Sequence, residues 1–256
     1  MATMSLRIYL TGRVGMEVDE SLVVSERDFR GRQERVALAY LVCERARPVT
    51  RAELAAVLWA GEAPPAWSTT LSAVVSRLRS LLDVPALRAR GVSISRGFGQ
   101  YRLFLPNDTW VDVDAATRAI DNAEAALRRG MPREAFGPAA VADNVTRRPF
   151  LSGGEDGWIA HERARLARIR VRALECLAKV WLHAGDGALA VEAAAEALAI
   201  DPLREHSLQL LMRAHALSGN PAAALQAYQR VREQLVSELG TDPSPETEAM
   251  YVELLG

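Results

Sequence analysis

One stretch of the sequence, from Ala66 to Leu105, restricts the fold more than any other. Its first half spaces six apolar residues so that they share one face of an α-helix: Leu71, Val74, Val75, Leu78, Leu81 and Leu82. The opposite face holds small and hydroxyl-bearing residues and one arginine: Thr69, Ser72, Ala73, Ser76, Arg77 and Ser80. Exposed helices usually carry glutamate and lysine there. Because this face has neither, it suits close approach to a polyanion.

Two short runs rich in β-forming residues follow this helix, Val92–Ser95 and Tyr101–Phe104. They are joined by Arg96-Gly97-Phe98-Gly99-Gln100, whose glycines permit the positive φ that a hairpin turn needs. A helix followed by a β-hairpin with an arginine at its tip is the layout of a winged helix. In that layout the helix enters the major groove of DNA and the wing reaches the minor groove.

The motifs SRLRSLL and SRGFGQYRL resemble the recognition helix and wing of the OmpR/PhoB-type winged-helix domain, in the version found in the Streptomyces antibiotic regulatory protein (SARP) family. The resemblance implies base contacts by Ser72, Ala73, Ser76 and Arg77, phosphate contacts by Thr69, Thr70 and Arg79, and a minor-groove contact by Arg96. The sequence departs from the family pattern at Ser76, where arginine is frequent, and at Gln100, which is expected to lengthen the wing turn.

Charge is divided unevenly along the chain. Residues 1–105 carry 15 arginines and 10 acidic residues, a net charge of +5, whereas residues 106–256 have a net charge of −6. A basic half joined to an acidic half fits a nucleic-acid binder coupled to a protein-interaction module. The preference for arginine over lysine is not evidence for DNA binding, because it is typical of a GC-rich genome; Lys179 is the only lysine.

Before the recognition helix, the chain predicts three short strands and two helices. The strands are Leu6–Leu10, Val14–Val18 and Ser21–Val24, and a helix covers Gly31–Glu44. Three arginines near its start, Arg30, Arg32 and Arg35, oppose the helix dipole, so they either lie on the surface or meet an anion. Thr50 and Glu53 form a capping-box pattern that starts a second helix near Arg51.

The loop after that second helix consists of Gly61, Glu62, Ala63, Pro64, Pro65 and Ala66. Its two prolines end the helix, because proline lacks the N–H that a helical turn requires. The family resemblance implies a contact with RNA polymerase at this loop; the alternative is a simple connector.

Beyond Pro106 the sequence is helical throughout. The predicted helices are Asp114–Arg129, Arg133–Ala142, Trp158–Ala184, Ala188–Ala199, Arg204–Leu217, Ala222–Leu239 and Glu246–Leu255. Gly185-Asp186 and Gly219-Asn220 repeat at a distance of 34 residues, the tetratricopeptide length, and Ala190 and Ala193 then match Ala224 and Ala227. Five arginines, Arg163, Arg165, Arg168, Arg170 and Arg172, form a run that we interpret as a solvated face in preference to a binding surface.

The segment Asp201–Leu255 resembles the bacterial transcriptional activation domain (BTAD) of SARP regulators. We therefore expect an α+β OmpR/PhoB-like winged-helix DNA-binding domain over residues 1–106 and an all-α, TPR-like activation domain over residues 107–256. The expected partners are promoter DNA with direct repeats, RNA polymerase and a second copy of the chain, as a homodimer or a tandem pair.

No pattern for catalysis, a cofactor or a metal is recognised. The one lysine lies outside any Gly-x-x-x-x-Gly-Lys sequence, and His161-Glu162 lacks the second histidine of a zinc helix, since Arg165 stands at that position. Because these catalytic patterns are missing, we expect that the protein is not an enzyme. Cys43 and Cys176 fit free thiols, and the sequence shows neither a signal peptide nor a membrane span, so we expect a cytoplasmic protein. The function predicted is sequence-specific DNA binding and transcriptional activation by recruitment of RNA polymerase, and the resemblance to the SARP family implies control of a biosynthetic (secondary-metabolite) gene cluster. The alternatives are a helical scaffold without DNA affinity and a sensor gated by a small ligand.

Overall fold

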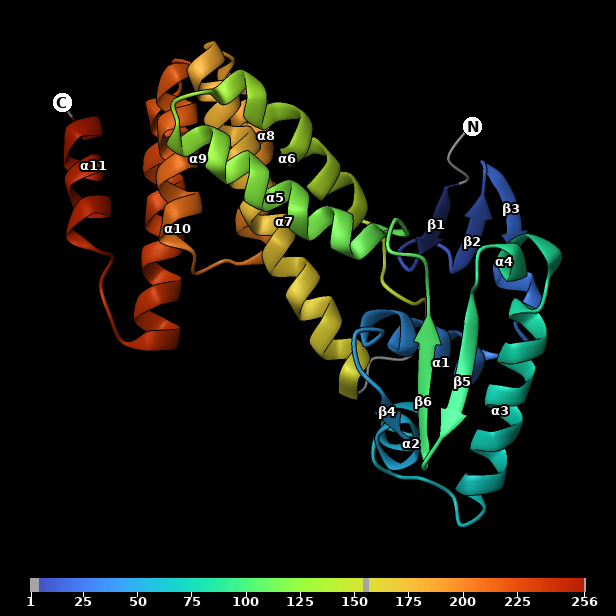
Figure 1. Ribbon diagram of the computed structural model, residues 1–256. Coiled ribbons are helices and arrows are strands. Elements are labelled where there is room, and N and C mark those ends of the chain that lie inside the picture. Colours follow the sequence, from blue (N-terminus) through green and yellow to red (C-terminus); the bar gives the residue numbers. More distant parts are fainter. Residues whose placement is uncertain (1–4, 154–156, 256) are drawn as a thin grey trace. The chain divides into compact units, whose positions relative to one another are not determined.

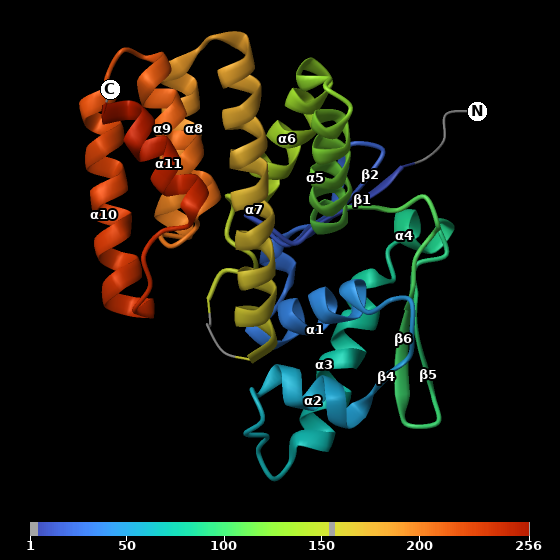
Figure 2. The same cartoon turned by 90° about the vertical axis from the view of Figure 1, so that its left-hand side faces the viewer.

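The computed structural model describes residues 5–153 and 157–255, which fall into two compact units (Figures 1 and 2). The first unit holds the described residues through Ala115 and those of 148–165, and the second holds 116–147 and the described residues from 166 on. The elements of the first unit are β1 (Leu6–Tyr9), β2 (Gly15–Val18), β3 (Ser21–Val24), the 3-10 turn η1 (Glu26–Asp28), α1 (Arg32–Cys43), β4 (Val49–Thr50), α2 (Arg51–Leu58), α3 (Trp67–Leu82), α4 (Pro85–Ala89), β5 (Ser93–Gly97), β6 (Gln100–Phe104) and β7 (Trp110–Val111).

Two helices begin in the first unit and continue in the second: α5 (Asp112–Arg128) and α7 (Gly157–Ala184). The second unit also contains α6 (Pro132–Thr146), α8 (Gly187–Ile200), α9 (Glu205–Leu217), α10 (Pro221–Leu239) and α11 (Pro245–Leu255). Each helix predicted in this half is present, with its ends shifted by no more than four residues, and the fold class is confirmed. Within the described ranges, no helix combines the length and the apolar character needed to cross a lipid bilayer.

The N-terminal sheet has the order β3-β2-β1-β7, with the three predicted strands antiparallel and β7 parallel to β1. Strand β7 was not predicted, because two residues are too few to show an alternating pattern. Asp112, which follows it directly, accepts hydrogen bonds from the amides of Leu10 and Thr11, both at 2.9 Å, and from the Thr11 hydroxyl at 2.8 Å. These bonds join β7 and α5 to the end of β1.

Helices α1, α2 and α3 pack around a shared apolar core, and the hairpin β5–β6 lies beside α3 (Figure 1). The predicted capping box at the start of α2 is confirmed, because the Glu53 amide donates to Thr50 Oγ1 at 3.1 Å and the Thr50 amide donates to the Glu53 carboxylate at 3.4 Å. Arg47 and Tyr40 both bond the Glu53 carboxylate. The ion pair lowers the pKa of Glu53 to about 2.

The wing is a three-stranded sheet with the order β4-β6-β5. Its turn has only two central residues, Phe98 and Gly99, because Gly97 already pairs with Gln100. The expectation that Gln100 lengthens this turn is therefore wrong. Gln100 is the first residue of β6, and its pairing with Thr50 on β4 draws it into the sheet.

The 34-residue repeat of the second unit appears as two equivalent helix starts. Gly185 and Gly219 have positive φ angles of 78° and 71°. The next residue then caps the following helix, since Asp186 accepts from the Leu189 amide at 3.0 Å and Asn220 from the Ala223 amide at 3.2 Å. The four matched alanines, Ala190, Ala193, Ala224 and Ala227, are all buried where neighbouring helices pack closely. These observations confirm the repeat.

The interpretation of the arginine run on α7 as a solvated face is wrong for most of its members. In the second unit, Arg172 bonds the Glu124 carboxylate through Nε at 2.7 Å, and Arg170 donates to Asp143 at 3.2 Å. In the first unit, Arg163 donates to the carbonyl oxygens of Phe150 and Leu151 at 3.0 and 2.6 Å. The half-buried arginines thus tie α7 to its neighbours, a role that depends on partners remote in sequence.

Candidate nucleic-acid interface

The exposed side of α3 forms a stripe of four short side chains. Thr69, Ala73, Ser76 and Ser80 are all exposed, and their spacing places them along one line of the helix. Of the six apolar residues predicted for the opposite side, Leu71, Val74, Val75, Leu78 and Leu82 are buried, and Leu81 is half-buried. No residue of α3 is acidic. A helix surface of this shape can lie close to a groove of a polyanionic duplex without charge repulsion.

Arg77 lies on the flank of this stripe that faces α1. Its Nε bonds the Glu34 carboxylate, and Glu34 also accepts from the Arg30 amide at 2.8 Å. Glu34 is only 4% exposed, whereas the Arg77 side chain is 36% exposed. Because Glu34 uses Nε, the two terminal nitrogens of Arg77 are the donors suited to an end-on bidentate contact.

Thr70 lies on the same flank as Arg77 and is half-buried. Its hydroxyl donates to the Ala66 carbonyl oxygen at 3.3 Å. As a predicted phosphate contact it is therefore less accessible than Thr69, which is exposed.

The other flank of α3 faces the wing and carries Ser72 and Arg79, both half-buried. Arg79 Nε donates to the Ile94 carbonyl oxygen on β5 at 2.9 Å, which fixes the helix against the hairpin. The Ser72 hydroxyl donates to the Ser68 carbonyl oxygen at 2.9 Å and accepts from Arg51 at 3.2 Å. A base contact by Ser72, as predicted, has to compete with these internal bonds.

Arg51 is the residue that sequence reasoning missed. Its amide donates to the Gly99 carbonyl oxygen in the wing turn at 3.1 Å. Its guanidinium donates to Tyr101 Oη at 2.7 Å, to the Ser68 carbonyl oxygen at 2.9 Å and to Ser68 Oγ at 2.7 Å. One side chain therefore connects the start of α2, the first turn of α3 and the wing. The sequence shows only that Arg51 lies at the start of a helix, because its partners are 17 to 50 positions away.

The tip of the wing and the start of α3 lie at the same end of the first unit (Figures 1 and 2). Arg96 is exposed on β5, opposite Tyr101 on β6, and Phe98 in the turn is fully exposed. Residues 92–105 include Arg96 and Arg102 and no acidic residue. The wing therefore continues the carboxylate-free surface of α3.

The loop from Gly61 to Ala66, the predicted polymerase contact, is exposed at every residue. Two backbone hydrogen bonds fix its conformation. The Gly61 amide donates to the Ala56 carbonyl oxygen at 3.0 Å, and the Trp67 amide donates to the Pro64 carbonyl oxygen at 2.9 Å. Near the start of α1, Arg35 pairs with Glu26 and Arg30 is exposed. These two observations favour the surface interpretation for Arg30 and Arg35, whereas Arg32 is half-buried and its Nε has no hydrogen-bond partner among the described residues.

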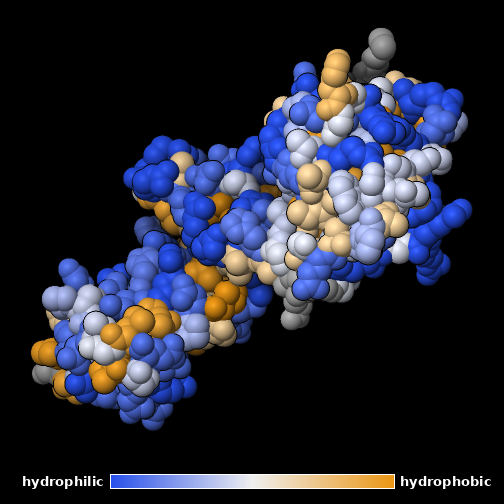
Figure 3. All heavy atoms as spheres, turned by 90° about the horizontal axis from the view of Figure 1, so that it is seen from below, coloured by the Kyte–Doolittle hydropathy of each residue, from blue (hydrophilic) through white to orange (hydrophobic). Residues whose placement is uncertain are grey.

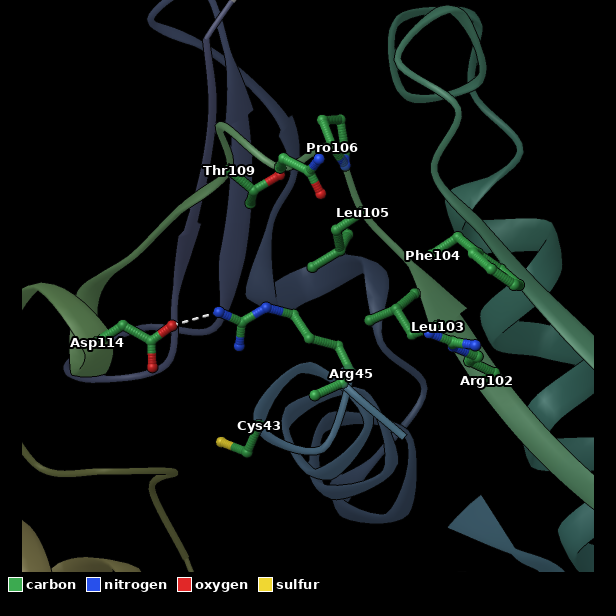
Figure 4. Close-up of a pocket in the computed structure, with 11 residues that line it drawn as sticks. Cys43, Arg45, Arg102, Leu103, Phe104, Leu105, Pro106, Thr109 and Asp114 are labelled. Atoms are coloured by element: carbon green, nitrogen blue, oxygen red, sulfur yellow. Dashed lines mark hydrogen bonds and ion pairs between the residues drawn. The ribbon is translucent and has the colours of Figure 1, made fainter. Parts of the chain in front are cut away.

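A hollow of about 570 Å³ lies behind the wing, between the end of α1 and the segment that follows β6 (Figure 4). Arg45 and Asp114 form an ion pair within it. Cys43 also lines it, and burial raises the pKa of its thiol to about 12, so the thiol is protonated. Thr109 Oγ1 is buried there without a hydrogen-bond partner among the described residues.

The chain is similar in sequence to known bacterial regulatory proteins. The chain is 33% identical to the regulatory protein AfsR of Streptomyces coelicolor over 234 residues, which cover 87% of this chain and 22% of AfsR. It is 31% identical over 248 residues to the transcriptional regulatory protein EmbR of Mycobacterium tuberculosis, covering 96% of this chain and 62% of EmbR. The chain thus spans about a fifth of AfsR and less than two thirds of EmbR.

A solved structure of M. tuberculosis EmbR, in complex with a low-affinity phosphopeptide, superposes with a TM-score of 0.84 at 26% identity. The match covers 99% of this chain and 65% of that one. The family model of the bacterial transcriptional activator domain matches residues 111–255. The chain therefore belongs to the bacterial transcriptional activator domain family, and with its N-terminal winged helix it is a member of the SARP regulators.

Proposed function

We propose that this protein is a sequence-specific DNA-binding transcriptional activator that acts by recruitment and without an enzymatic step. The observation that carries the proposal is the exposed, acid-free stripe of α3, flanked by Arg77 and Arg79 and extended by the wing. The names of its relatives, which are transcriptional regulators, support the same class of function.

In the proposed complex, α3 lies in the major groove. Ala73, Ser76 and Arg77 contact base edges, with Ser72 at the margin, and a bidentate bond from Arg77 to guanine would contribute about 1–3 kcal/mol of base discrimination. Thr69, Thr70 and the terminal nitrogens of Arg79 bind phosphates, and Arg96 enters the minor groove. We propose residues 1–106 as the DNA-binding domain and residues 107–256 as the activation domain.

The activation domain would hold a second copy of the chain, or RNA polymerase, on promoters with direct repeats. Apolar side chains gather over the C-terminal helices on the face shown in Figure 3. The exposed large apolar residues of α10 and α11 are Val236, Leu239, Val252 and Leu255. The exposed loop from Gly61 to Ala66 supports a polymerase contact in the first unit. The proposed targets are genes of a biosynthetic cluster.

Binding to the DNA upstream of the protein's own gene tests the proposal, measured by fluorescence anisotropy at several salt concentrations. We expect a specific complex whose affinity falls steeply with salt. Arg77→Ala should remove the preference for the specific site, while Arg79→Ala should weaken binding to all sequences. Arg88→Ala is a matched control, because Arg88 is exposed on α4 and its partner Asp83 caps the C-terminal end of α3, beyond the proposed contact residues. An absence of salt-dependent binding would instead favour a helical scaffold.

The hollow behind the wing favours a second candidate, a sensor in which a small polar ligand gates DNA binding. Arg45, Arg102 and Asp114 line this hollow and carry charged groups that such a ligand could bind. Thermal-shift screening of metabolites tests this candidate, with Asp114→Asn as the variant that should lose the response while the size of the side chain is kept.

A further inference from the structure

The turn of the wing contains an aromatic residue that the fold does not use. Phe98 is fully exposed at the tip of the β5–β6 hairpin. Phe104 on the same hairpin is 43% exposed, and the Arg102 guanidinium lies over its ring at 5.2 Å from the centre. Because the Phe98 ring is exposed, it contributes no hydrophobic stabilisation to this fold.

The backbone at Phe98 is also unfavourable for this residue. Phe98 and Gly99 have φ angles of 49° and 74°, so both central residues of the turn are left-handed, as in a type I′ turn. Glycine and asparagine adopt this conformation readily, whereas a bulky side chain is strained in it. A ring that is both strained and exposed indicates a binding role, since neither its packing nor its backbone preference explains it.

The surroundings of the ring indicate a polyanionic partner. The hairpin residues 92–105 include two arginines and no carboxylate, and Arg96 precedes the turn by two positions. The Arg51 amide holds the Gly99 carbonyl oxygen at 3.1 Å, and the Arg51 guanidinium bonds the first turn of α3. The tip is thus fixed at the end of the unit where the proposed recognition helix begins.

We propose that Phe98 is a minor-groove wedge, whose ring enters double-stranded DNA beside Arg96 and bends the duplex by partly unstacking a base step. This inference rests on the proposed DNA-binding function and adds a residue and a deformation to it. Apolar side chains inserted from the minor groove kink DNA in this way. The cost of unstacking is least at pyrimidine–purine steps, so the ring would contribute sequence preference at a position without hydrogen-bonded readout.

The test compares Phe98→Asn with wild type and with Phe104→Ala, which removes an aromatic ring from the other end of the same hairpin. Phe98→Asn places asparagine before Gly99, the preferred pair for a type I′ turn. Its melting temperature should therefore equal or exceed that of wild type, so that any loss of binding cannot be attributed to unfolding. Affinity for the upstream DNA is measured by anisotropy, and the bend by energy transfer between dyes at the ends of the duplex.

We expect Phe98→Asn to weaken binding by about tenfold, in the range found for removal of base-stacking aromatic residues, and to reduce the bend. Phe104→Ala should bind and bend as wild type does. Equal affinity and bend for Phe98→Asn would overturn the proposal. So would normal DNA binding with lost transcriptional activation, which would assign the ring to a protein partner. If wild type itself does not bind the duplex, the proposed function has failed, a result distinct from either of these.

Discussion

Glu34 on α1 holds Arg77 on α3 through an ion pair between a buried carboxylate and the Nε of the guanidinium. The two residues are 43 positions apart in the chain. A second bond, from the Arg30 amide to Glu34 at 2.8 Å, fixes the carboxylate at the start of α1. The orientation of the main candidate for base recognition is therefore set by a residue outside the recognition helix.

Removal of Arg77 should affect folding as well as recognition. Arg77→Ala leaves the buried Glu34 carboxylate without its charged partner, which we expect to cost about 1–3 kcal/mol of unfolding free energy. The double variant with Glu34→Gln should recover part of this loss, because the amide no longer carries a buried charge. Urea denaturation of wild type, both single variants and the double variant measures the coupling. Strictly additive effects would mean that the pair contributes nothing to stability.

Arg51 should influence DNA affinity without contacting DNA. Its donors are engaged by Gly99, Tyr101, Ser68 and Ser72, so Arg51→Lys should loosen the wing relative to α3 and weaken binding by about tenfold, on the scale of losing one or two hydrogen bonds. The dependence of log affinity on log salt should be unchanged, because no phosphate contact is lost.

Arg79→Ala provides the comparison, since loss of one phosphate contact should reduce that salt slope by about one. If Arg51→Lys reduces the slope by the same amount, Arg51 binds phosphate itself and its positioning role is wrong.

Local patterns predicted much of this fold, because the responsible interactions lie close together in sequence. The capping box at Thr50, the apolar face of α3 and the repeated starts of α8 and α10 all depend on residues within one or two helical turns. Strand β7 and the partners of Arg51 and Arg77 escaped prediction, because those bonds join residues far apart in the chain. For the candidate site, the sequence predicted which side of α3 is exposed. It did not predict the hydrogen-bond partners of Arg77 and Arg79, because these depend on tertiary packing.

Gly187 should be intolerant of a side chain. It begins α8, and a Cβ built there lies 2.3 Å from Ser218 Oγ, 3.0 Å from the Ser218 amide nitrogen and 3.1 Å from the Ala214 carbonyl oxygen. Two of these atoms belong to the backbone at the end of α9, which cannot rotate away. We expect Gly187→Ala to destabilise the protein by about 1–3 kcal/mol, as overpacking in a core does.

Gly137 in α6 is the matched control, since a Cβ there meets nothing within 4 Å. Gly137→Ala should change the unfolding free energy by less than about 1 kcal/mol, because the smaller loss of backbone entropy is opposed by contact between the new Cβ and the ring of the next residue, Pro138. The urea midpoint should therefore fall clearly only for Gly187→Ala. A neutral or stabilising effect of Gly187→Ala would show that α8 and α9 can separate without loss.

Stability should fall as the pH is lowered from about 7.5 to 5.5, on either side of the ordinary histidine pKa. Burial, followed by the charge of Lys179, lowers the pKa of His206 from its ordinary value of 6.5, although the charge of Glu175 raises it. Burial, followed by the charge of Arg230, lowers the pKa of His215. Below pH 6.5 the unfolded chain therefore binds more protons than the folded chain, so stability decreases with falling pH. The urea midpoint measured across this range should decline less in a variant carrying His206→Gln and His215→Gln. An unaltered decline in that variant would assign the pH dependence to other groups.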